Sequence, residues 1–221
     1  MKRKKLLDLF CKAGGCTKGY QCAGFYVVGV DIDPQPRYCG DEFVQADALE
    51  YVAKHGHEFD AIHASPPCQA YSVTKFLSSR NHPELVPQTR KALQLTGRPW
   101  VIENVPGAPL LNPLMLCGTM FGLDVIRHRL FECDPPIYFA PAMCAHVGKT
   151  GTTRRMREMG ITRCPSQADG FRFVSVAGKG YLVNEARRAM GIDWMIQSEL
   201  SQAIPPAYTE YIGRNLMEVL L

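Results

Sequence analysis

The chain has 221 residues, of which 46% are hydrophobic and 21% are charged. This length suits a single α/β domain with a sizeable core and room for a small inserted lobe. The sequence has no run near the roughly eighteen apolar residues of a membrane span, and residues 2–10 are too short and too polar for a signal peptide. Nine scattered cysteines, an odd number, favour reduced thiols over a disulfide framework. We therefore expect a cytoplasmic protein without membrane contact.

The formal net charge of +4 is a weak indication of nucleic-acid binding, but the charge is unevenly distributed. Residues 140–180 carry seven Lys and Arg against two Asp and Glu, an excess that leaves the rest of the chain nearly neutral. Such a segment is either a solvated basic loop or a surface for an anionic partner.

The first predicted element is a buried strand at residues 6–11, which leads into a glycine-rich segment at residues 12–19. Glycine lets the backbone approach a ligand closely, and we expect a helix to start near Tyr20–Ala23 with its amino end toward polar or anionic groups. Lys12 stands where dinucleotide-binding enzymes have an early glycine. The sequence therefore predicts a cofactor loop of another type.

Two further strands are predicted at residues 26–30 and 43–46, each followed by an aspartate. Asp31 is placed to accept hydrogen bonds from both hydroxyls of a ribose, with Ile32 against an adenine face. Asp47 is placed to accept from an adenine amino group. Either of these acids alone is more often a turn or cap residue, but three successive strands that end in Gly-Gly, Asp and Asp indicate an adenosine-bearing cofactor.

Two more predicted strands, residues 59–65 and 99–102, precede Pro66-Pro67-Cys68-Gln69 and Glu103-Asn104-Val105. Cys68 and Glu103 therefore follow strand ends of the kind where open α/β sheets gather ligands. A thiol and a carboxylate in one crevice are what an enzyme needs to add a nucleophile to a pyrimidine and supply a proton. This pair indicates cytosine chemistry.

Helical patterns are predicted at residues 83–96, 184–190, 198–204 and 208–221. Their apolar positions are expected to cover the sheet. The sequence has no internal repeat and no low-complexity linker, so two independent domains are not expected.

Taken in order, the motifs resemble those of the DNA cytosine-5 methyltransferase family. The resemblance rests on Asp8-Leu9-Phe10 with Gly14-Gly15, Pro67-Cys68-Gln69, Glu103-Asn104-Val105, Arg127-His128-Arg129 and the stretch from Ala203 to Gly213. It covers residues 5–132 and 182–221. It implies a small form, of bacterial or phage type, with a Rossmann-like S-adenosylmethionine-dependent methyltransferase fold. Restriction partnership, host regulation and genome self-protection remain open as roles.

The resemblance divides the chain into three parts. Residues 1–132 would form the catalytic and cofactor-binding core, residues 133–181 a short target-recognition insert, and residues 182–221 a segment that completes the core. A recognition lobe this small buries little DNA surface, which predicts short or relaxed sequence specificity.

The resemblance also assigns roles to residues. Cys68 would add as a thiolate to carbon 6 of a flipped-out cytosine, and carbon 5 would then take a methyl group from S-adenosylmethionine. Glu103 would hold ring nitrogen 3 and the exocyclic amine, while Arg127 and Arg129 would hold the base oxygen, a phosphate or Glu103. The expected cofactor-binding residues are Phe10, Lys12, Gly14, Gly15, Asp31, Ile32, Asp47, Pro67 and Arg214. The expected DNA-binding residues are Gln69, Ser72, Lys75 and Arg80 of a lid loop, with Arg154, Arg155 and Arg157 of the insert.

This chemistry requires no metal, and none is expected. Cys133, Cys144, His146 and Cys164 would supply ligands for a zinc site in the insert, but they lack a tight Cys-x-x-Cys spacing. We therefore interpret them as separate small residues. Cys117 is interpreted as a packing residue.

Three alternatives stay open. Arg214 follows Gly213, where the family often has asparagine; beside the cofactor, with Lys12, it would favour carboxy-S-adenosylmethionine and carboxymethyl transfer, although a surface arginine is the simpler interpretation. An RNA cytosine methyltransferase on the same scaffold is the second, and a non-catalytic DNA-binding protein is the third. We expect double-stranded DNA as the partner of a monomeric protein.

Overall fold

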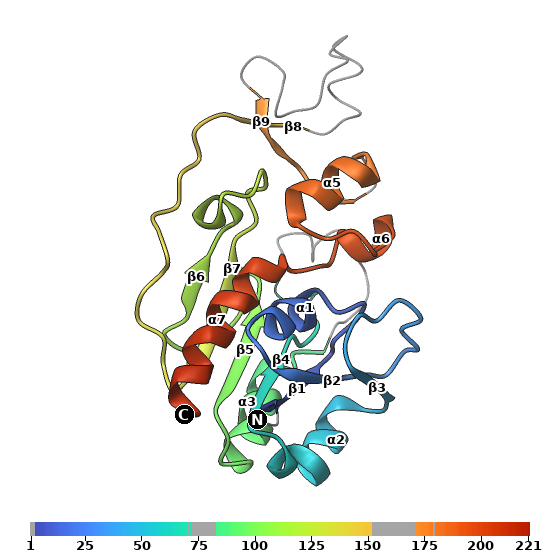
Figure 1. Cartoon of the computed structure of the whole chain (residues 1–221), viewed down its shortest axis with the longest axis vertical. Coiled ribbons are helices and arrows are strands. Elements are labelled where there is room, and N and C mark those ends of the chain that lie inside the picture. Colours follow the sequence, from blue (N-terminus) through green and yellow to red (C-terminus); the bar gives the residue numbers. More distant parts are fainter. Residues whose placement is uncertain (1–2, 70, 72–82, 152–170, 179) are drawn as a thin grey trace.

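The computed structural model describes residues 3–69, 71, 83–151, 171–178 and 180–221. A seven-stranded sheet runs through the molecule in the order β3-β2-β1-β4-β5-β7-β6 (Figure 1). Its first five strands are parallel, and β7 runs antiparallel to both β5 and β6. The strands are β1 (Lys5–Leu9), β2 (Tyr26–Asp31), β3 (Glu42–Gln45), β4 (Ala61–Ala64), β5 (Trp100–Asn104), β6 (Leu114–Leu116) and β7 (Arg129–Asp134).

Helices connect and cover these strands. The helices are α1 (Gly15–Cys22), α2 (Ala48–His55), α3 (Val86–Leu95), α5 (Val183–Met190), α6 (Gln197–Leu200) and α7 (Pro206–Val219), with 3-10 turns η1 (Gly56–Glu58) and η3 (Gly118–Phe121). A separate two-stranded sheet joins β8 (Lys149–Gly151) to β9 (Phe171–Val174). Among the described residues, no helix combines the length and the apolar content needed to cross a bilayer.

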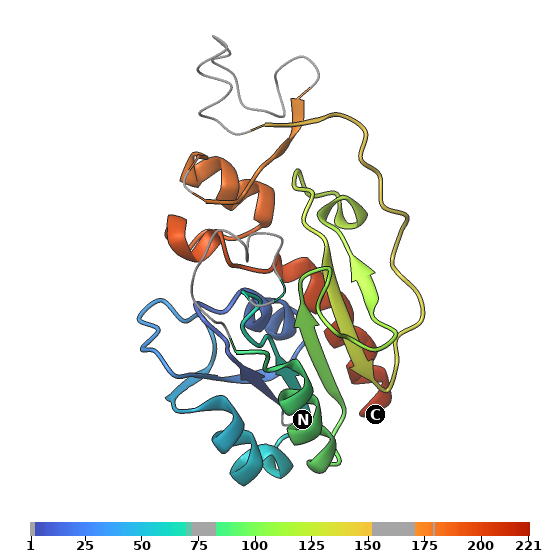
Figure 2. The ribbon, with the colours of Figure 1, turned by 180° about the vertical axis from the view of Figure 1, so that it is seen from behind.

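Alternate residues of each central strand point to opposite faces of the sheet and build two cores. On one face, Leu6 packs in a cluster with Tyr20 of α1 and Tyr208 of α7. On the other face, Leu7 packs in a cluster with Val52 of α2. Figures 1 and 2 show the two layers, with α1 and α7 over one face and α2 and α3 over the other. Because both faces are covered, most residues of the central strands are apolar, and Asp8, His63 and Glu103 are buried polar exceptions.

Helix α7 packs closely on α1 through glycine. A Cβ on Gly19 would collide with the carbonyl oxygen of Pro206 and the hydroxyl of Thr209. A Cβ on Gly213 would lie 2.7 Å from the Cβ of Ala23. These glycines let the two backbones approach, which seats the C-terminal helix on the helix that follows the glycine-rich segment.

A third core joins the chain after β9 to the rest of the molecule. Val174, Tyr181 and Leu200 lie in one buried cluster with Ala13 of the glycine-rich segment and Val125. The C-terminal part of the sequence therefore packs beside the carboxyl end of β1.

The mixed α/β architecture expected from the sequence is confirmed, although several element bounds differ. Helix α1 begins at Gly15, ahead of the expected start near Tyr20, because Gly14 takes a left-handed φ of 89° and caps the helix directly. Glu103 lies inside β5 and not after it. Helix α6 ends at Leu200, short of the expected 198–204. Pro205 disfavours a helical conformation only at Ile204, directly before it.

Candidate active site

The carboxyl ends of β4 and β5 lie side by side and carry Cys68 and Glu103. The two strands pair in parallel register, with Ala64 opposite Ile102. Asn104 then donates from its side-chain amide to the carbonyl of Pro66, a hydrogen bond of 2.9 Å between buried groups. This bond ties the loop that carries the thiol to the strand that carries the carboxylate.

Glu103 is buried and forms an ion pair with an arginine. Its Oε1 lies 3.2 Å from Nε of Arg129, whose side chain is itself largely buried. Burial raises the pKa of Glu103, although Arg129, a hydrogen bond from Ser65 and the charge of Arg127 all lower it. Because burial outweighs these charges, the carboxyl group holds its proton to higher pH than an exposed glutamate.

A buried hydrogen-bonded chain lies behind Glu103. The ring of His63 links the hydroxyl of Tyr20 at Nδ1 to the hydroxyl of Ser65 at Nε2, each at 2.9 Å. Burial lowers the pKa of His63 to about 3, so the ring is neutral and donates from one nitrogen only. Ser65 in turn donates to Glu103. His63 and Ser65 were expected only as strand residues, because nothing in their spacing marks a network that crosses from β4 to α1 and β5.

The thiol of Cys68 is half-buried beside these charges. Burial raises its pKa, the carboxylate of Glu103 raises it further, and Arg129 and Arg127 lower it. The thiol is therefore a poorer source of thiolate than a free cysteine until the local charge changes. A substrate that neutralises Glu103 through hydrogen bonding would favour the nucleophilic form.

The structure gives the two arginines different partners. Arg127 is buried and donates from its two terminal nitrogens to the carbonyls of Val176 and Ser201, at 3.0 and 2.8 Å. Its pKa falls to about 9, because of burial first and the charge of Arg129 second, so it remains a cation at neutral pH. Arg127 therefore joins the segments around residues 176 and 201 to the start of β7. Arg129 pairs with Glu103 instead.

A second group of predicted residues gathers where β1 and β2 end. Asp31 is 2% exposed and accepts from the backbone nitrogen of Lys12 at 3.1 Å, from its Nζ at 3.3 Å, and from the backbone nitrogen of Asp33 at 3.1 Å. A carboxylate has about four acceptor positions. A ribose diol at Asp31 would therefore displace the ammonium group of Lys12.

The backbone of the glycine-rich segment is unusual. Phe10 and Lys12 take left-handed φ angles of 60° and 47°, and Gly14 takes 89°. Lys12 thus stands in a conformation that favours glycine, in agreement with its place in the motif. A Cβ on Gly15 would lie 2.6 Å from the carbonyl oxygen of Ile204, so this glycine is required for packing as well.

The remaining predicted cofactor residues at this edge differ in exposure. Ile32 exposes 65% of its surface, which leaves its side chain free to contact a flat aromatic ring. Asp47 caps α2, where Oδ1 accepts from the backbone nitrogens of Leu49 and Glu50 at 2.9 Å each. With Asp31 and the glycine-rich segment, the residues present fit an adenosine-bearing cofactor. Pro67 is partly buried next to Cys68.

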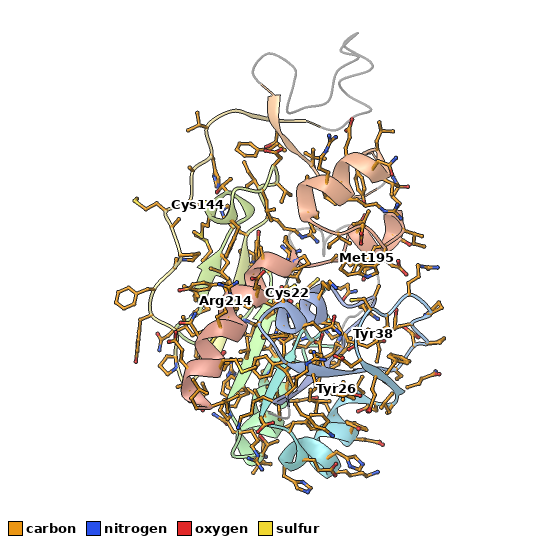
Figure 3. All side chains as sticks on the ribbon, viewed as in Figure 1. Cys22, Tyr26, Tyr38, Cys144, Met195 and Arg214 are labelled. Atoms are coloured by element: carbon orange, nitrogen blue, oxygen red, sulfur yellow. The ribbon has the colours of Figure 1, made fainter. Side chains whose placement is uncertain are left out.

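Arg214 does not join these residues, which corrects its assignment to the cofactor site. Figure 3 shows Arg214 on α7. Its side chain is 69% exposed and pairs with Glu210 one turn earlier, at 2.5 Å. The buried stripe of α7 runs through Ile212 and Gly213 instead, so Arg214 faces solvent. Lys12 is paired with Asp31. The hypothesis of carboxy-S-adenosylmethionine required Arg214 and Lys12 as cations beside the cofactor, and both are paired with carboxylates instead.

Most of the predicted DNA-binding residues lie outside the described residues. These are Ser72, Lys75, Arg80, Arg154, Arg155 and Arg157. Gln69 is described and is exposed directly after Cys68.

Three solved structures share the fold over nearly the whole chain. One is described as a candidate DNA modification methyltransferase encoded within an E. coli prophage, with a TM-score of 0.63 and 16% identity over 98% of this chain and 99% of that one. The S. pombe Dnmt2 methyltransferase has a TM-score of 0.59 and 15% identity, covering 99% of both chains. The Entamoeba histolytica methyltransferase EhMeth has a TM-score of 0.60 and 11% identity, covering 100% of both chains. No family model and no curated protein sequence matches the chain.

These similarities establish the fold. The chain has the Rossmann-like fold of S-adenosylmethionine-dependent methyltransferases, as expected from its motifs. At such low sequence identity, activity and substrate have to be argued from the residues of this chain.

Proposed function

We propose that this protein is a DNA cytosine-5 methyltransferase that uses S-adenosylmethionine. The observation that carries the proposal is the ion-paired, buried Glu103 on the strand next to the loop of Cys68. A carboxyl group whose pKa is raised by burial and a thiol with two arginines nearby are the groups that activation of a cytosine ring needs.

The proposed steps follow from these groups. Cys68 adds as a thiolate to carbon 6 of cytosine, Glu103 donates a hydrogen bond to ring nitrogen 3, and the ring becomes nucleophilic at carbon 5. S-adenosylmethionine, when bound, supplies the methyl group that carbon 5 takes. A base then removes the carbon-5 proton and the electron pair expels Cys68, which restores the ring. Arg129 holds Glu103 in position throughout.

The cofactor in this proposal lies at the ends of β1, β2 and β3. Phe10, Gly14 and Gly15 supply backbone close to the ligand, Asp31 holds the ribose, and Ile32 covers the adenine. Asp47 is the proposed partner of the adenine amino group, in addition to its role as a helix cap. Pro67, directly before Cys68 in the sequence, is a further proposed cofactor contact.

The cytosine in this proposal is flipped out of a duplex, since a stacked base cannot reach a half-buried thiol. Residues 133–181 are the proposed target-recognition insert, between a core of residues 1–132 and a completing segment of residues 182–221. The lid loop after Gln69 and the basic residues of the insert are the proposed contacts to the DNA backbone.

A covalent trap tests the proposal. The purified protein is incubated with S-adenosylmethionine and a duplex that contains 5-fluorocytosine, which blocks release of Cys68. We expect a denaturation-resistant protein–DNA adduct for the unchanged chain and for Cys22→Ala, whose thiol is exposed at the end of α1. Cys68→Ala should form none. An adduct that persists in Cys68→Ala would refute the assignment of the nucleophile.

Mass spectrometry of nucleosides from treated DNA then identifies the product. A gain of one methyl group on deoxycytidine is expected. Competition between DNA and RNA of matched sequence separates the proposal from its RNA alternative: preferential methylation of the RNA would reassign the substrate and leave the roles of Cys68 and Glu103 intact. Binding without any modified base would favour a non-catalytic protein.

A further inference from the structure

Four metal-ligating side chains meet at a point that the proposed reaction does not use. Cys117 directly precedes η3, and His128 directly precedes β7. Cys144 and His146 lie in the loop after β7. One ligand atom from each residue lies within 4.8 Å of the other three. Residues far apart in the sequence thus present two sulfurs and two imidazole nitrogens to one small volume.

The separations suit a tetrahedral ion. Nε2 of His146 lies 3.5 Å from Sγ of Cys117, and Nε2 of His128 lies 3.4 Å from Sγ of Cys144. Zinc bonds of about 2.3 Å to sulfur and about 2.0 Å to nitrogen place such ligands about 3.5 Å apart. Sγ of Cys144 and Nε2 of His146 are closer, at 2.7 Å, and would move apart by about 0.8 Å around an ion. His146 is exposed, so its ring has room to move.

Thr119 supports the cluster from outside. Its hydroxyl oxygen lies 3.4 Å from Sγ of Cys117 and 3.6 Å from Sγ of Cys144. The same oxygen accepts a hydrogen bond from the backbone nitrogen of Ala145 at 3.2 Å. Outer groups that orient ligands in this way are a regular feature of metal sites.

The loop that supplies two of the ligands is attached near its start, where Ile137 packs against the first core and the carbonyl of Phe139 accepts from Tyr211, but its apolar side chains are mostly exposed. In residues 135–148, Tyr138, Phe139, Met143 and Val147 are all exposed, so this stretch gains little from hydrophobic burial. Figure 3 shows Cys144 on this loop, beside η3. An irregular segment with exposed apolar side chains is held in place by ligation more readily than by packing.

We propose that Cys117, His128, Cys144 and His146 bind one structural Zn²⁺. Two thiolates and two neutral imidazoles in a closed tetrahedron are a structural zinc set, and binding releases the two thiol protons. The ion anchors residues 135–148 to the end of β6 and to the segment that carries Arg127 and Arg129.

This set differs from the ligands considered from sequence spacing. Cys144 and His146 are retained, but Cys133 lies on β7, largely buried, with its sulfur toward the carbonyl of Phe131. Cys164 lies outside the described residues. Cys117 and His128 replace them, so the expectation that the protein needs no metal is revised by this proposal.

Metal analysis tests the site without reference to activity. The protein is purified without a metal-affinity column, freed of metal under reducing conditions, and given Zn²⁺ alone. We expect about one tightly bound zinc per chain, and Co²⁺ should give the visible absorption of a tetrahedral thiolate complex. Cys144→Ser and His146→Ala should each weaken zinc binding at least about tenfold.

The variants are chosen to keep the fold. Cys144 and His146 lie on the loop and outside the three cores, so circular dichroism of both variants should match the unchanged chain. Cys22→Ser is the matched control and should retain about one zinc. Zinc retention by Cys144→Ser, failure of the unchanged chain to take up Zn²⁺ or Co²⁺, or a Cys117–Cys144 disulfide under reducing purification would each overturn the proposal.

Discussion

Nε of Arg129 lies 3.2 Å from Oε1 of Glu103. Arg129 is the first residue of β7, and Glu103 lies in β5, the antiparallel strand beside it. The pair is largely buried, so breaking it leaves an uncompensated charge. Arg129 also donates to the carbonyl of His128 at 2.8 Å, which connects the pair to the proposed zinc site. The proposed catalytic carboxyl group thus depends on the geometry of the segment from 127 to 129.

Replacing Arg129 should remove most activity. Arg129→Ala is expected to lower the single-turnover rate of methyl transfer by about 100-fold, because one positioned charge near the reacting ring is lost. Arg214→Ala is the matched control, since Arg214 belongs to an exposed pair on α7, and its rate should stay within about twofold. Equal losses in the two variants would contradict the placement of both arginines.

The reactivity of Cys68 should respond to Glu103. Because the carboxylate raises the pKa of the thiol, Glu103→Gln should lower that pKa and increase the rate of Cys68 alkylation at neutral pH. Arg129→Ala should have the opposite effect, since Arg129 lowers the pKa of the thiol. Mass spectrometry of iodoacetamide-treated protein across a pH series measures both changes. Identical profiles for the three proteins would show that the thiol and the carboxyl group are not coupled.

Cofactor affinity should distinguish two neighbouring aspartates. Asp31→Asn is expected to weaken binding of S-adenosylhomocysteine by about 10- to 100-fold, the range for loss of hydrogen bonds to a charged group. Asp33→Asn should change affinity by less than about threefold, because its carboxylate is 70% exposed. Calorimetric titration measures both. A larger loss for Asp33→Asn would move the ribose contact to that residue.

Stability should fall with rising pH because of Asp8. Burial raises its pKa to about 7 despite a hydrogen bond from Thr17, whereas an unfolded aspartate titrates near 4. Between about pH 4 and pH 7 the folded protein keeps a proton on Asp8 that the unfolded chain has lost. The contribution of Asp8 to the free energy of unfolding is therefore complete below about pH 4 and declines as the pH rises to about 7.

Asp8→Asn cannot lose this proton and should remove that part of the pH dependence. Relative to the unchanged chain, the variant should gain up to about 4 kcal/mol in unfolding free energy between pH 4 and pH 8. Urea unfolding of both proteins at the two pH values provides the comparison. A constant difference between them would mean that Asp8 is ionised in the folded protein throughout.

Local patterns were sufficient for the core of this protein. Apolar runs that end in Gly-Gly, Asp and Pro-Pro-Cys predict parallel strands with polar groups at one edge, and the sheet has this arrangement. These predictions succeed because a strand and the turn that follows it are encoded by residues close together in the sequence. The same patterns could not predict β6 and β7, whose pairing depends on contacts made across the sheet.

The sequence by itself determined the parallel sheet, the thiol after β4 and the carboxyl group at the end of β5, because strand periodicity and proline turns act locally. Tertiary structure alone decided that Arg129 and not Arg127 pairs with Glu103, that Arg214 faces solvent, and that Cys117 and His128 meet Cys144 and His146. Those relationships join side chains from separate segments, and only packing of the folded chain determines which of them come within bonding distance.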